Sequence, residues 1–316
     1  MNIRVMTADD IPFAMRVKAQ NRWNQLEADW RRQLALEPEG SFVAELDSVP
    51  VGTACACVFG DVAWINMVLV EQQQRGKGIG TALMRHVLHW LDDRRVPTIR
   101  LDATSLGQPV YGKLGFTGDF TLHRFEGNLP SPLRGRGAAA FLPSPSGRGA
   151  GGEGPVFLPS PLRGRGAGGE GAASCEISQL LPSDLSAISA LDQSITQTSR
   201  EKLLHSLQDA HPTLMRKCTI ANSLAGYAFC RSGSNAWQLG PILGTPAAGR
   251  ALLLDAAERF AGECVYMDIP ADNADAIAVA QALGLTVQRS FLRMTRGRRI
   301  VEDVHRTWAS SGPEKG

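Results

Sequence analysis

Two long stretches of the chain, residues 1–127 and 173–297, alternate between strand-like and helix-like patterns of hydrophobic positions. In the first stretch, apolar and β-branched residues gather in short runs at 41–46, 52–59 and 63–70, with tight turns between them. Runs of this length, bounded by turn residues, are typical of buried strands. This part of the chain is therefore expected to form a sheet.

Helical spacing marks the segments between the strands. Leu83, Met84, Val87, Leu88 and Leu91 recur at intervals of three and four residues, which places them on one face of a helix. Complete elements are expected, in chain order, as strand 3–6, helices 9–20 and 24–37, strands 41–46, 52–59 and 63–70, helix 81–94, strand 98–103, helix 109–114 and strand 120–125. The order is β-α-α-β-β-β-α-β-α-β.

The second stretch repeats that order. Its expected elements are strand 175–179, helices 183–191 and 199–209, strands 215–221, 224–231 and 236–243, helix 247–261, strand 264–269, helix 274–283 and strand 285–294. The pattern predicts an α/β fold with mixed sheets, made of two similar domains at 1–127 and 173–297.

The segment between the domains, residues 128–172, has a different composition. It contains three versions of one phrase, beginning LPSP at Leu129, Leu142 and Leu158, and is rich in Pro, Gly and Arg. Such a segment buries too little apolar surface to offset its ordering entropy, so we expect a mobile, disordered repeat linker. Its RGRG pieces could bind RNA, as arginine-glycine tracts do, but the near-identical copies are better explained as an expanded repeat inserted between two domains. Residues 298–316 are expected to be a polar tail.

Composition excludes several classes of protein. The formal net charge is only +2, so we expect no nucleic-acid partner and no membrane-surface partner. No run reaches the ~18 apolar residues of a membrane span, and the amino terminus does not resemble a signal peptide. The six cysteines form no disulfide framework and no metal motif. These features predict a cytoplasmic location and no metal.

The most informative segment begins with the apolar run Val68-Leu69-Val70. It leads into Gln74-Arg75-Gly76-Lys77-Gly78-Ile79-Gly80-Thr81, which opens onto the helix at 81–94. Glycines allow the backbone to turn sharply and approach a ligand, and a helix N-terminus carries about half a positive charge. The segment is therefore expected to bind a phosphate group.

The glycine spacing excludes two common phosphate loops. A Walker loop needs Ser or Thr directly after Lys77, where Gly78 stands, and a dinucleotide fingerprint needs a third glycine where Thr81 stands. The remaining pattern, R-x-x-G-x-G from Arg75 to Gly80, resembles the pyrophosphate-binding motif of the GNAT superfamily of acetyl-CoA-dependent N-acetyltransferases. Tyr111 to Phe116 resembles the Y-x-x-x-G-F ending of that family. The element order of both stretches also agrees, so a tandem GNAT arrangement with a divergent carboxy-terminal domain is expected.

The resemblance implies acetyl transfer from acetyl-CoA, the co-substrate, to an amine by direct attack. It implies that the cofactor contacts Val68, Leu69, Val70, Arg75, Gly76, Lys77, Gly78, Ile79, Gly80 and Thr81, and that Tyr111 protonates the departing sulfur. The amine acceptor is a small molecule or a protein. Alternatives are a non-catalytic acyl-CoA sensor and an enzyme with a longer acyl donor, and homodimerisation stays open.

Two further roles stay less defined. Glu71, Asp102 and Glu45 are candidates for a general base, and none of them is preferred. In the family the acceptor pocket is built largely by the first two helices, where the chain carries Trp23, Asn24, Asp29 and Trp30. Aromatic walls beside polar side chains would suit an ammonium or polar acceptor, although packing of the tryptophans on the sheet is equally consistent.

The second domain lacks the chemical motif. After Ile242 the chain reads Gly244-Thr245-Pro246 with no R-x-x-G-x-G, and Ala280 stands where Tyr111 stands in the first domain. Three roles remain open for this domain: a degenerate structural partner, a wall of the first domain's acceptor pocket, or a second site with altered cofactor contacts.

Overall fold

The computed structural model describes residues 1–131 and 174–313, and we refer to these segments as the amino-terminal and carboxy-terminal halves. Nearly all of the linker predicted at 128–172 lies outside the described residues. The prediction that this linker is mobile, and the alternative that its RGRG pieces bind RNA, therefore concern residues outside the described segments.

The amino-terminal half contains the ten elements that the pattern predicts, in the predicted order. They are β1 (Asn2–Val5), α1 (Ile11–Gln20), α2 (Glu27–Leu36), β2 (Ser41–Leu46), β3 (Val49–Phe59), β4 (Val62–Val70), α3 (Ile79–Asp93), β5 (Thr98–Ala103), α4 (Gln108–Lys113) and β6 (Thr117–Asn128).

The carboxy-terminal half repeats the same ten elements and adds one strand. They are β7 (Cys175–Gln179), α5 (Leu185–Thr196), α6 (Glu201–Ala210), β8 (Arg216–Ile220), β9 (Ser223–Arg231), β10 (Trp237–Gly244), α7 (Pro246–Arg259), β11 (Cys264–Pro270), α8 (Ala274–Ala282), β12 (Thr286–Gly297) and β13 (Thr307–Ala309). The predicted α/β class with two equivalent element orders is confirmed.

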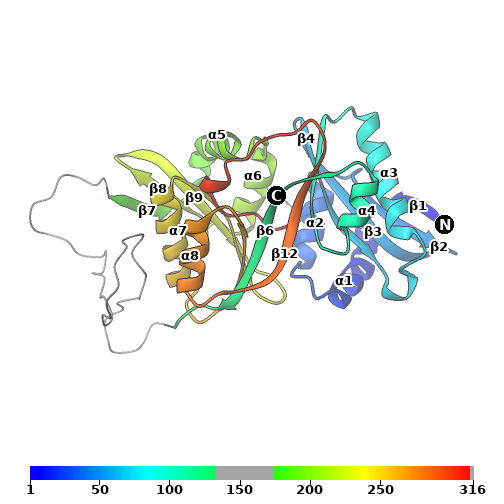
Figure 1. The fold of residues 1–316 in the computed structure, drawn as a ribbon, viewed down its shortest axis with the longest axis horizontal. Helices are drawn as coiled ribbons and strands as arrows, with labels where there is room; N and C mark the ends of the chain where they lie inside the picture. The colour runs from blue at the N-terminus through cyan, green and yellow to red at the C-terminus, as the bar shows by residue number, and fades with distance from the viewer. Residues whose placement is uncertain (132–173, 314–316) are drawn as a thin grey trace, which may run out of the picture.

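All strands join one continuous sheet, and the last strands of the two halves are exchanged. The order is β1-β2-β3-β4-β5-β12-β6-β11-β10-β9-β8-β7, with β13 beside β10. Strand β12 therefore lies between β5 and β6, and β6 lies between β12 and β11, along the middle of the molecule (Figure 1). The predicted boundaries at 127 and 173 separate the chain in sequence, but the sheet of each half includes a strand from the other.

Helices cover both faces of the sheet because its strands alternate their buried side chains. In the amino-terminal half, α3 packs on the face that presents Phe42 and Ile65, while α1 and α2 pack on the opposite face with Val43 and Cys55. In the other half, α7 and α8 cover one face. Helices α5 and α6 cover the other face and also contact Trp64 of β4, so the two halves share a core.

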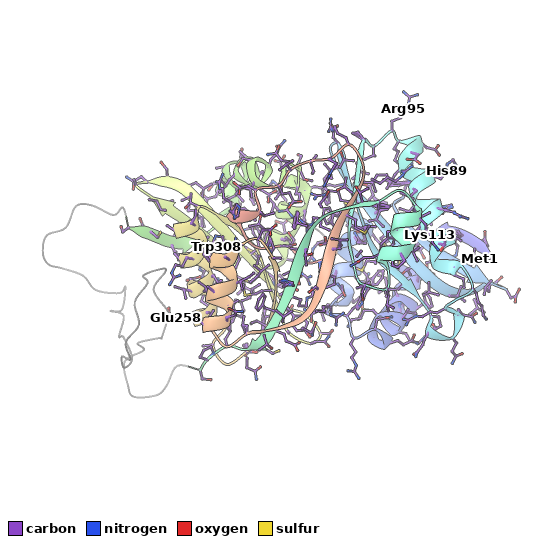
Figure 2. The ribbon with its side chains drawn as sticks, in the orientation of Figure 1. Met1, His89, Arg95, Lys113, Glu258 and Trp308 are labelled. Atoms are coloured by element: carbon purple, nitrogen blue, oxygen red, sulfur yellow. The ribbon has the colours of Figure 1, made fainter. Side chains whose placement is uncertain are left out.

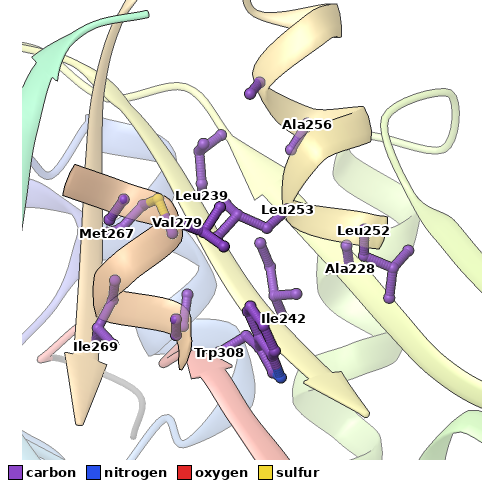
Figure 3. Packing of buried hydrophobic residues seen from close by; sticks show 14 of the residues in the cluster. Ala228, Leu239, Ile242, Leu252, Leu253, Ala256, Met267, Ile269, Val279 and Trp308 are labelled. Carbon is purple, nitrogen blue, oxygen red and sulfur yellow. The ribbon is translucent and has the colours of Figure 1, made fainter. Parts of the chain in front are cut away.

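The prediction of a polar tail at 298–316 was wrong for the residues described there. Strand β13 pairs with β10, and Trp308 is 1% exposed in a cluster with Ile242 and Leu253 (Figure 3). Figure 2 marks Trp308 among the elements of the carboxy-terminal half, while His89 and Arg95 lie at the outer edge of the other half. Although the segment is mostly polar in composition, its Trp308 side chain packs in the core of the carboxy-terminal half.

A buried network of charged side chains links β5 and the exchanged strand β12 to Glu302, which lies in the segment before β13. Arg293 of β12 donates to both oxygens of Asp102 at 2.9 and 3.0 Å, and also to Glu302 at 2.8 Å. Arg100 of β5 bonds the other side of Glu302 and donates to Asp119 at 3.0 Å. The arginines lower the pKa of Glu302 below its usual range. Removing one partner of such a network leaves a buried charge uncompensated, which is strongly destabilising.

Candidate functional site

Strands β4 and β5 separate after a short parallel pairing. Only Val62, Ala63 and Trp64 pair with β5, so the later part of β4 has no neighbour on that side. A bulge opens β4 at Met67, whose φ is +52°, and Thr53 Oγ1 donates to the Met67 carbonyl at 2.8 Å. Residues 68–70 therefore lie beyond the part of β4 that pairs with β5, and an extended ligand placed along them would pair with their backbone groups.

The glycine loop after β4 takes the conformation that glycine permits. Gly76 and Gly78 have φ of +78° and +80°, and no atom lies within 4 Å of the position where a Cβ would stand on either one. A side chain at these positions would be strained by the backbone, and it would also occupy the open space in front of the loop.

Helix α3 begins at this loop with unshielded amides. Gly78 is its N-cap residue, and no side chain caps the helix. The first N–H groups of a helix have no carbonyl one turn back, so the amides of Ile79, Gly80 and Thr81 remain available to an anion.

The two cations of the motif have partners in this structure. The Arg75 guanidinium donates to the Val70 carbonyl at 3.3 Å and to Asn21 Oδ1 at 2.6 Å. The Lys77 ammonium donates to Gln74 Oε1 at 2.8 Å. Arg75 thereby ties the glycine loop to the end of β4 and to α1, while both side chains keep their positive charge beside the open amides.

A groove of about 1130 Å³ runs along these elements. Of the ten residues predicted to contact the cofactor, nine line it: Val68, Leu69, Val70, Arg75, Gly76, Gly78, Ile79, Gly80 and Thr81. Lys77 belongs to the same loop without lining the groove. The opposite wall is formed by residues 104–108 and by α4. The tertiary structure thus brings the predicted set together in one elongated hollow.

Tyr111 of α4 lies where this groove meets a smaller pocket, and it lines both. Its ring packs against Gly107, where a Cβ would stand only 2.6 Å away, and it meets Phe116 edge to face at 6.1 Å. Burial raises the pKa of Tyr111 to about 12, so the phenol stays protonated at neutral pH.

The smaller pocket has a volume of about 90 Å³ and joins the groove at Val68. We call it the acceptor pocket. Its walls come from both halves: Trp23, Asn24, Gln25, Ile65, Asn66, Met67, Val68, Leu101, Asp102, Thr104, Tyr111 and Arg124 of the first, and Arg289, Phe291 and Pro313 of the second. The carboxy-terminal half therefore completes this pocket, which is one of the three roles left open by the sequence.

The four predicted acceptor residues do not share one role. Trp23 lines both hollows, and Asn24 lines the acceptor pocket. The Asn24 side chain is held by loop 234–236, donating to Ala236 O at 3.0 Å and accepting from Asn235 N at 2.9 Å. This contact also explains why α2 starts at Glu27 and not at 24.

Asp29 and Trp30, which were also predicted to contact the acceptor, line neither hollow. Asp29 caps the start of α2 by accepting from Leu26 N at 2.9 Å, and it pairs with Arg32 at 2.8 Å. Trp30 is fully buried in the core under α1 and α2. Packing of this tryptophan on the sheet, the alternative interpretation, is what the structure shows.

None of the three candidates for a general base is both unengaged and next to the acceptor pocket. Asp102 lines it, but both carboxylate oxygens bind Arg293. Glu71 accepts from Gln20 and Arg16, which lower its pKa, and lines neither hollow. Glu45 pairs with Arg4 at 2.8 Å, beside β1.

The sequence did not indicate the residues that come from the exchanged strands. Arg124 of β6, Arg289 and Phe291 of β12, and Pro313 all line the acceptor pocket. Arg289 and Phe291 are 178 or more residues away from Tyr111 in the chain, and only the pairing of β12 with β5 brings them close. No local motif marks them.

The corresponding place in the carboxy-terminal half is filled by the chain itself. Strand β13 pairs with Ile242 and Leu243 of β10, and Ser310 N donates to Asp268 O at 2.8 Å. It therefore occupies the gap between β10 and β11 that is open between β4 and β5. The side chain of Thr245 caps α7 by accepting from Ala248 N. The Trp308 ring packs directly on Gly249, where an added Cβ atom would stand only 2.1 Å from the ring.

Within residues 1–131 and 174–313, no group of three or more His, Cys, Asp or Glu side chains is arranged to hold a metal ion. In those same segments no helix has the length and apolar character needed to cross a bilayer.

Comparison with known protein families gives two matches. A model described as "Acetyltransferase (GNAT) family" matches residues 8–116, and one described as "Acetyltransferase (GNAT) domain" matches residues 188–309. Together they span more than two thirds of the chain. A comparison with curated proteins gives no match.

Solved structures resemble the whole chain. A Pyrococcus horikoshii protein assigned as an acetyltransferase superposes with a TM-score of 0.75 at 22% identity, covering 100% of this chain and 95% of its own. A GCN5-related N-acetyltransferase from Sphaerobacter thermophilus gives 0.61 at 14% identity, covering 97% and 98%. A tandem GNAT protein from the clavulanic acid biosynthesis pathway gives 0.59 at 15%, covering 95% and 99%. At these low identities the superpositions show a shared fold and nothing beyond it.

Proposed function

The chain belongs to the GNAT acetyltransferase family, with two copies of its domain in tandem, and on that premise we propose that its amino-terminal half transfers an acetyl group from acetyl-CoA to an amine. The observation that carries the proposal is the meeting of the groove and the acceptor pocket at Val68 and Tyr111.

The groove suits each part of acetyl-CoA. The pyrophosphate would bind the open amides of Ile79, Gly80 and Thr81, with the helix dipole and Arg75 adding positive potential. The pantetheine arm carries amide groups that would pair with the backbone of β4 where β5 has moved away. The thioester would then lie at Val68, facing the acceptor pocket.

The chemistry at that junction is a direct acyl transfer. The neutral amine nitrogen forms a bond to the acetyl carbon, the carbon–sulfur bond breaks, and the electron pair leaves with the CoA sulfur. Tyr111 donates its phenolic proton to that sulfur, the nitrogen releases its extra proton to solvent, and the Tyr111 phenolate takes up a proton from solvent, which completes the turnover. A phenol with a raised pKa is fully protonated when the thiolate departs.

The role of the carboxy-terminal half follows from its filled gap. Because β13 and the cap of Thr245 occupy the places that a cofactor would need, this half supplies pocket walls and not a second active site. A non-catalytic acyl-CoA sensor would use the same groove, but it would not need a tyrosine at the opening of a second pocket. A longer acyl donor is a further outcome that the test below distinguishes.

Calorimetric titration of acetyl-CoA into the full chain tests the proposal. Gly78→Glu places a strained, anionic side chain in front of the amides and is expected to abolish binding. Gly284→Glu is the matched control, since Gly284 also has a positive φ of +83° with open space around it, but lies outside the groove.

Transfer is then measured by mass spectrometry with a library of amines. Binding that is lost only in Gly78→Glu, together with an acetylated amine, would support the proposal. Binding without transfer to any amine would favour the sensor, and faster transfer from a longer acyl-CoA would favour the other donor. Equal binding by Gly78→Glu and wild type would rule out the groove as the cofactor site.

A further inference from the structure

The acceptor pocket has more positive than negative charge among its walls, and all but one of its charged groups are paired. Asp102 binds Arg293 through both oxygens at 2.9 and 3.0 Å. Arg124 binds both oxygens of Asp268 at 2.8 and 2.7 Å and stacks near the ring of Phe291. These pairs are internally neutralised, so neither of them calls for a charged ligand.

Arg289 is the exception. Its Nε donates to Gln288 Oε1 at 2.9 Å, and no carboxylate among the described residues lies within ion-pair distance of its guanidinium. A register shift between Val287 and Arg289 on β12 turns the side chain toward the pocket. Burial and the neighbouring Arg124 lower its pKa, and these two effects outweigh the opposite influence of Tyr266, Asp268 and Glu126, which act on the guanidinium without pairing with it.

The position of Arg289 is as informative as its charge. It lines both the groove and the acceptor pocket, as do Trp23, Val68, Thr104 and Tyr111, so it lies at the place where the amine must meet the thioester. The two terminal nitrogens of a guanidinium form a planar fork that matches a carboxylate. A half-buried arginine without an acid partner beside a reaction site is therefore suited to binding an anionic group of a reactant.

We propose that the acceptor is a small amine bearing a carboxylate close to its nitrogen, and that Arg289 binds this carboxylate. The inference rests on the proposed function. The pocket volume of about 90 Å³ favours a small acceptor, and the apolar walls formed by Phe291 and Leu101 suit the carbon atoms of its side chain.

Two other sources of an anion would reach the same region. The phosphates of CoA belong to the glycine loop at the far end of β4, beyond the pantetheine arm, and an acyl group such as succinyl carries a carboxylate of its own. The acceptor is favoured because Arg289 belongs to the wall of the acceptor pocket together with Arg124 and Phe291.

The test uses the full chain with acetyl-CoA and pairs of amines. Each common α-amino acid, β-alanine and 4-aminobutyrate is compared with its own carboxamide, and the N-acetyl product is measured by mass spectrometry. Succinyl-CoA with the uncharged amines forms a second arm. Acetyl-CoA affinity is measured separately by calorimetry for every variant.

We expect at least one amino acid to exceed its carboxamide in kcat/KM by about 10- to 100-fold, as a charge-assisted hydrogen bond provides. Arg289→Gln should remove that preference mainly through KM and leave acetyl-CoA binding unchanged, while Arg289→Lys should restore part of it. Arg296→Gln is the matched control, because Arg296 lies on the same strand, outside the pocket, and already pairs with Asp92 at 2.7 Å.

Several results would overturn the inference. They are a preference for carboxamides, a carboxylate preference that survives in Arg289→Gln, weaker acetyl-CoA binding in that variant, or loss of succinyl transfer alone. Absence of product from the whole panel, with acetyl-CoA still bound, would reject this acceptor class. Absence of acetyl-CoA binding would instead reject the proposed function.

Discussion

At the scale of single residues, the proposed active centre depends on how burial changes side-chain chemistry. Tyr111 is a phenol enclosed by α4, Gly107 and Phe116, and that enclosure moves its pKa to about 12. Cys55 and Cys57 are buried under the helices of the sheet, and burial also raises the pKa of each thiol to about 12. Burial therefore favours a proton donor at position 111 and makes both thiols poor nucleophiles.

Tyr111→Phe tests the donor directly. Loss of a general acid typically costs 10²- to 10⁴-fold, so kcat should fall by about 100-fold while the Kd of acetyl-CoA stays the same. The donor must be protonated, so its contribution disappears only as pH rises through about 12. Wild-type kcat should therefore show no alkaline decline from this group between pH 6 and 9, as steady-state assays over that range would reveal. Unchanged kcat in the variant for every accepted amine would exclude Tyr111 as the acid.

At the scale of elements, the two halves use one architecture in two ways. The gap beside β4 stays open and leads to the uncapped helix α3, while the gap beside β10 contains β13 and leads to α7, which Thr245 caps. Ala280, at the position of Tyr111, is fully buried. The same fold thus provides a site in one half and a packed core in the other.

One acetyl-CoA should therefore bind per chain, even when β13 is weakened. Trp308→Ala removes a buried indole and should lower the free energy of unfolding by about 3–5 kcal/mol, measured by denaturant unfolding. Calorimetric stoichiometry should stay at one, because α7 keeps its cap and lacks the glycine loop.

Val301→Ala is the control for that change, because Val301 precedes β13 in the same segment and is 85% exposed. Its effect should stay within about 0.5 kcal/mol. A second equivalent of acetyl-CoA bound by the Trp308 variant would contradict the assignment of the second half, and an equal stability of the two variants would contradict the packing of the segment.

At the scale of the whole molecule, strand exchange makes the two halves interdependent. Strand β12 fills the sheet between β5 and β6. Arg293 and Glu302 pair with each other, and they also pair with Asp102 and Arg100 of the other half. A half produced alone would expose a long unpaired strand edge, and Asp102 would lose its arginine.

Fragments 1–131 and 174–316, expressed together, should copurify as an equimolar complex that binds acetyl-CoA. Fragment 1–131 expressed alone should fail to give a folded monomer, because β5 loses its partner β12. Size-exclusion chromatography with mass determination and calorimetry measure both outcomes. Two separately folded monomers would show that the exchanged strands do not hold the halves together.

Local patterns predicted the elements and the conformation of the glycine loop well, because the signals lie within short segments. Alternation and helical spacing gave twenty elements in the observed order, and the glycines at 76 and 78 required the turn that the structure shows. The lining of the smaller pocket was harder to predict. Trp30 and Asp29 lie on the expected helix, but Trp30 is buried in the core and Asp29 pairs with Arg32.

The sequence by itself determined the fold class, the tandem repeat and the glycine loop before α3, because each depends on residues that are neighbours in the chain. Only the tertiary structure decided which half supplies each wall of the pocket. Strand order depends on contacts across the sheet between residues far apart in the chain, and no local pattern records them. The exchange of β6 and β12 brings Arg289 to Tyr111, and the burial of Trp308 closes the second gap.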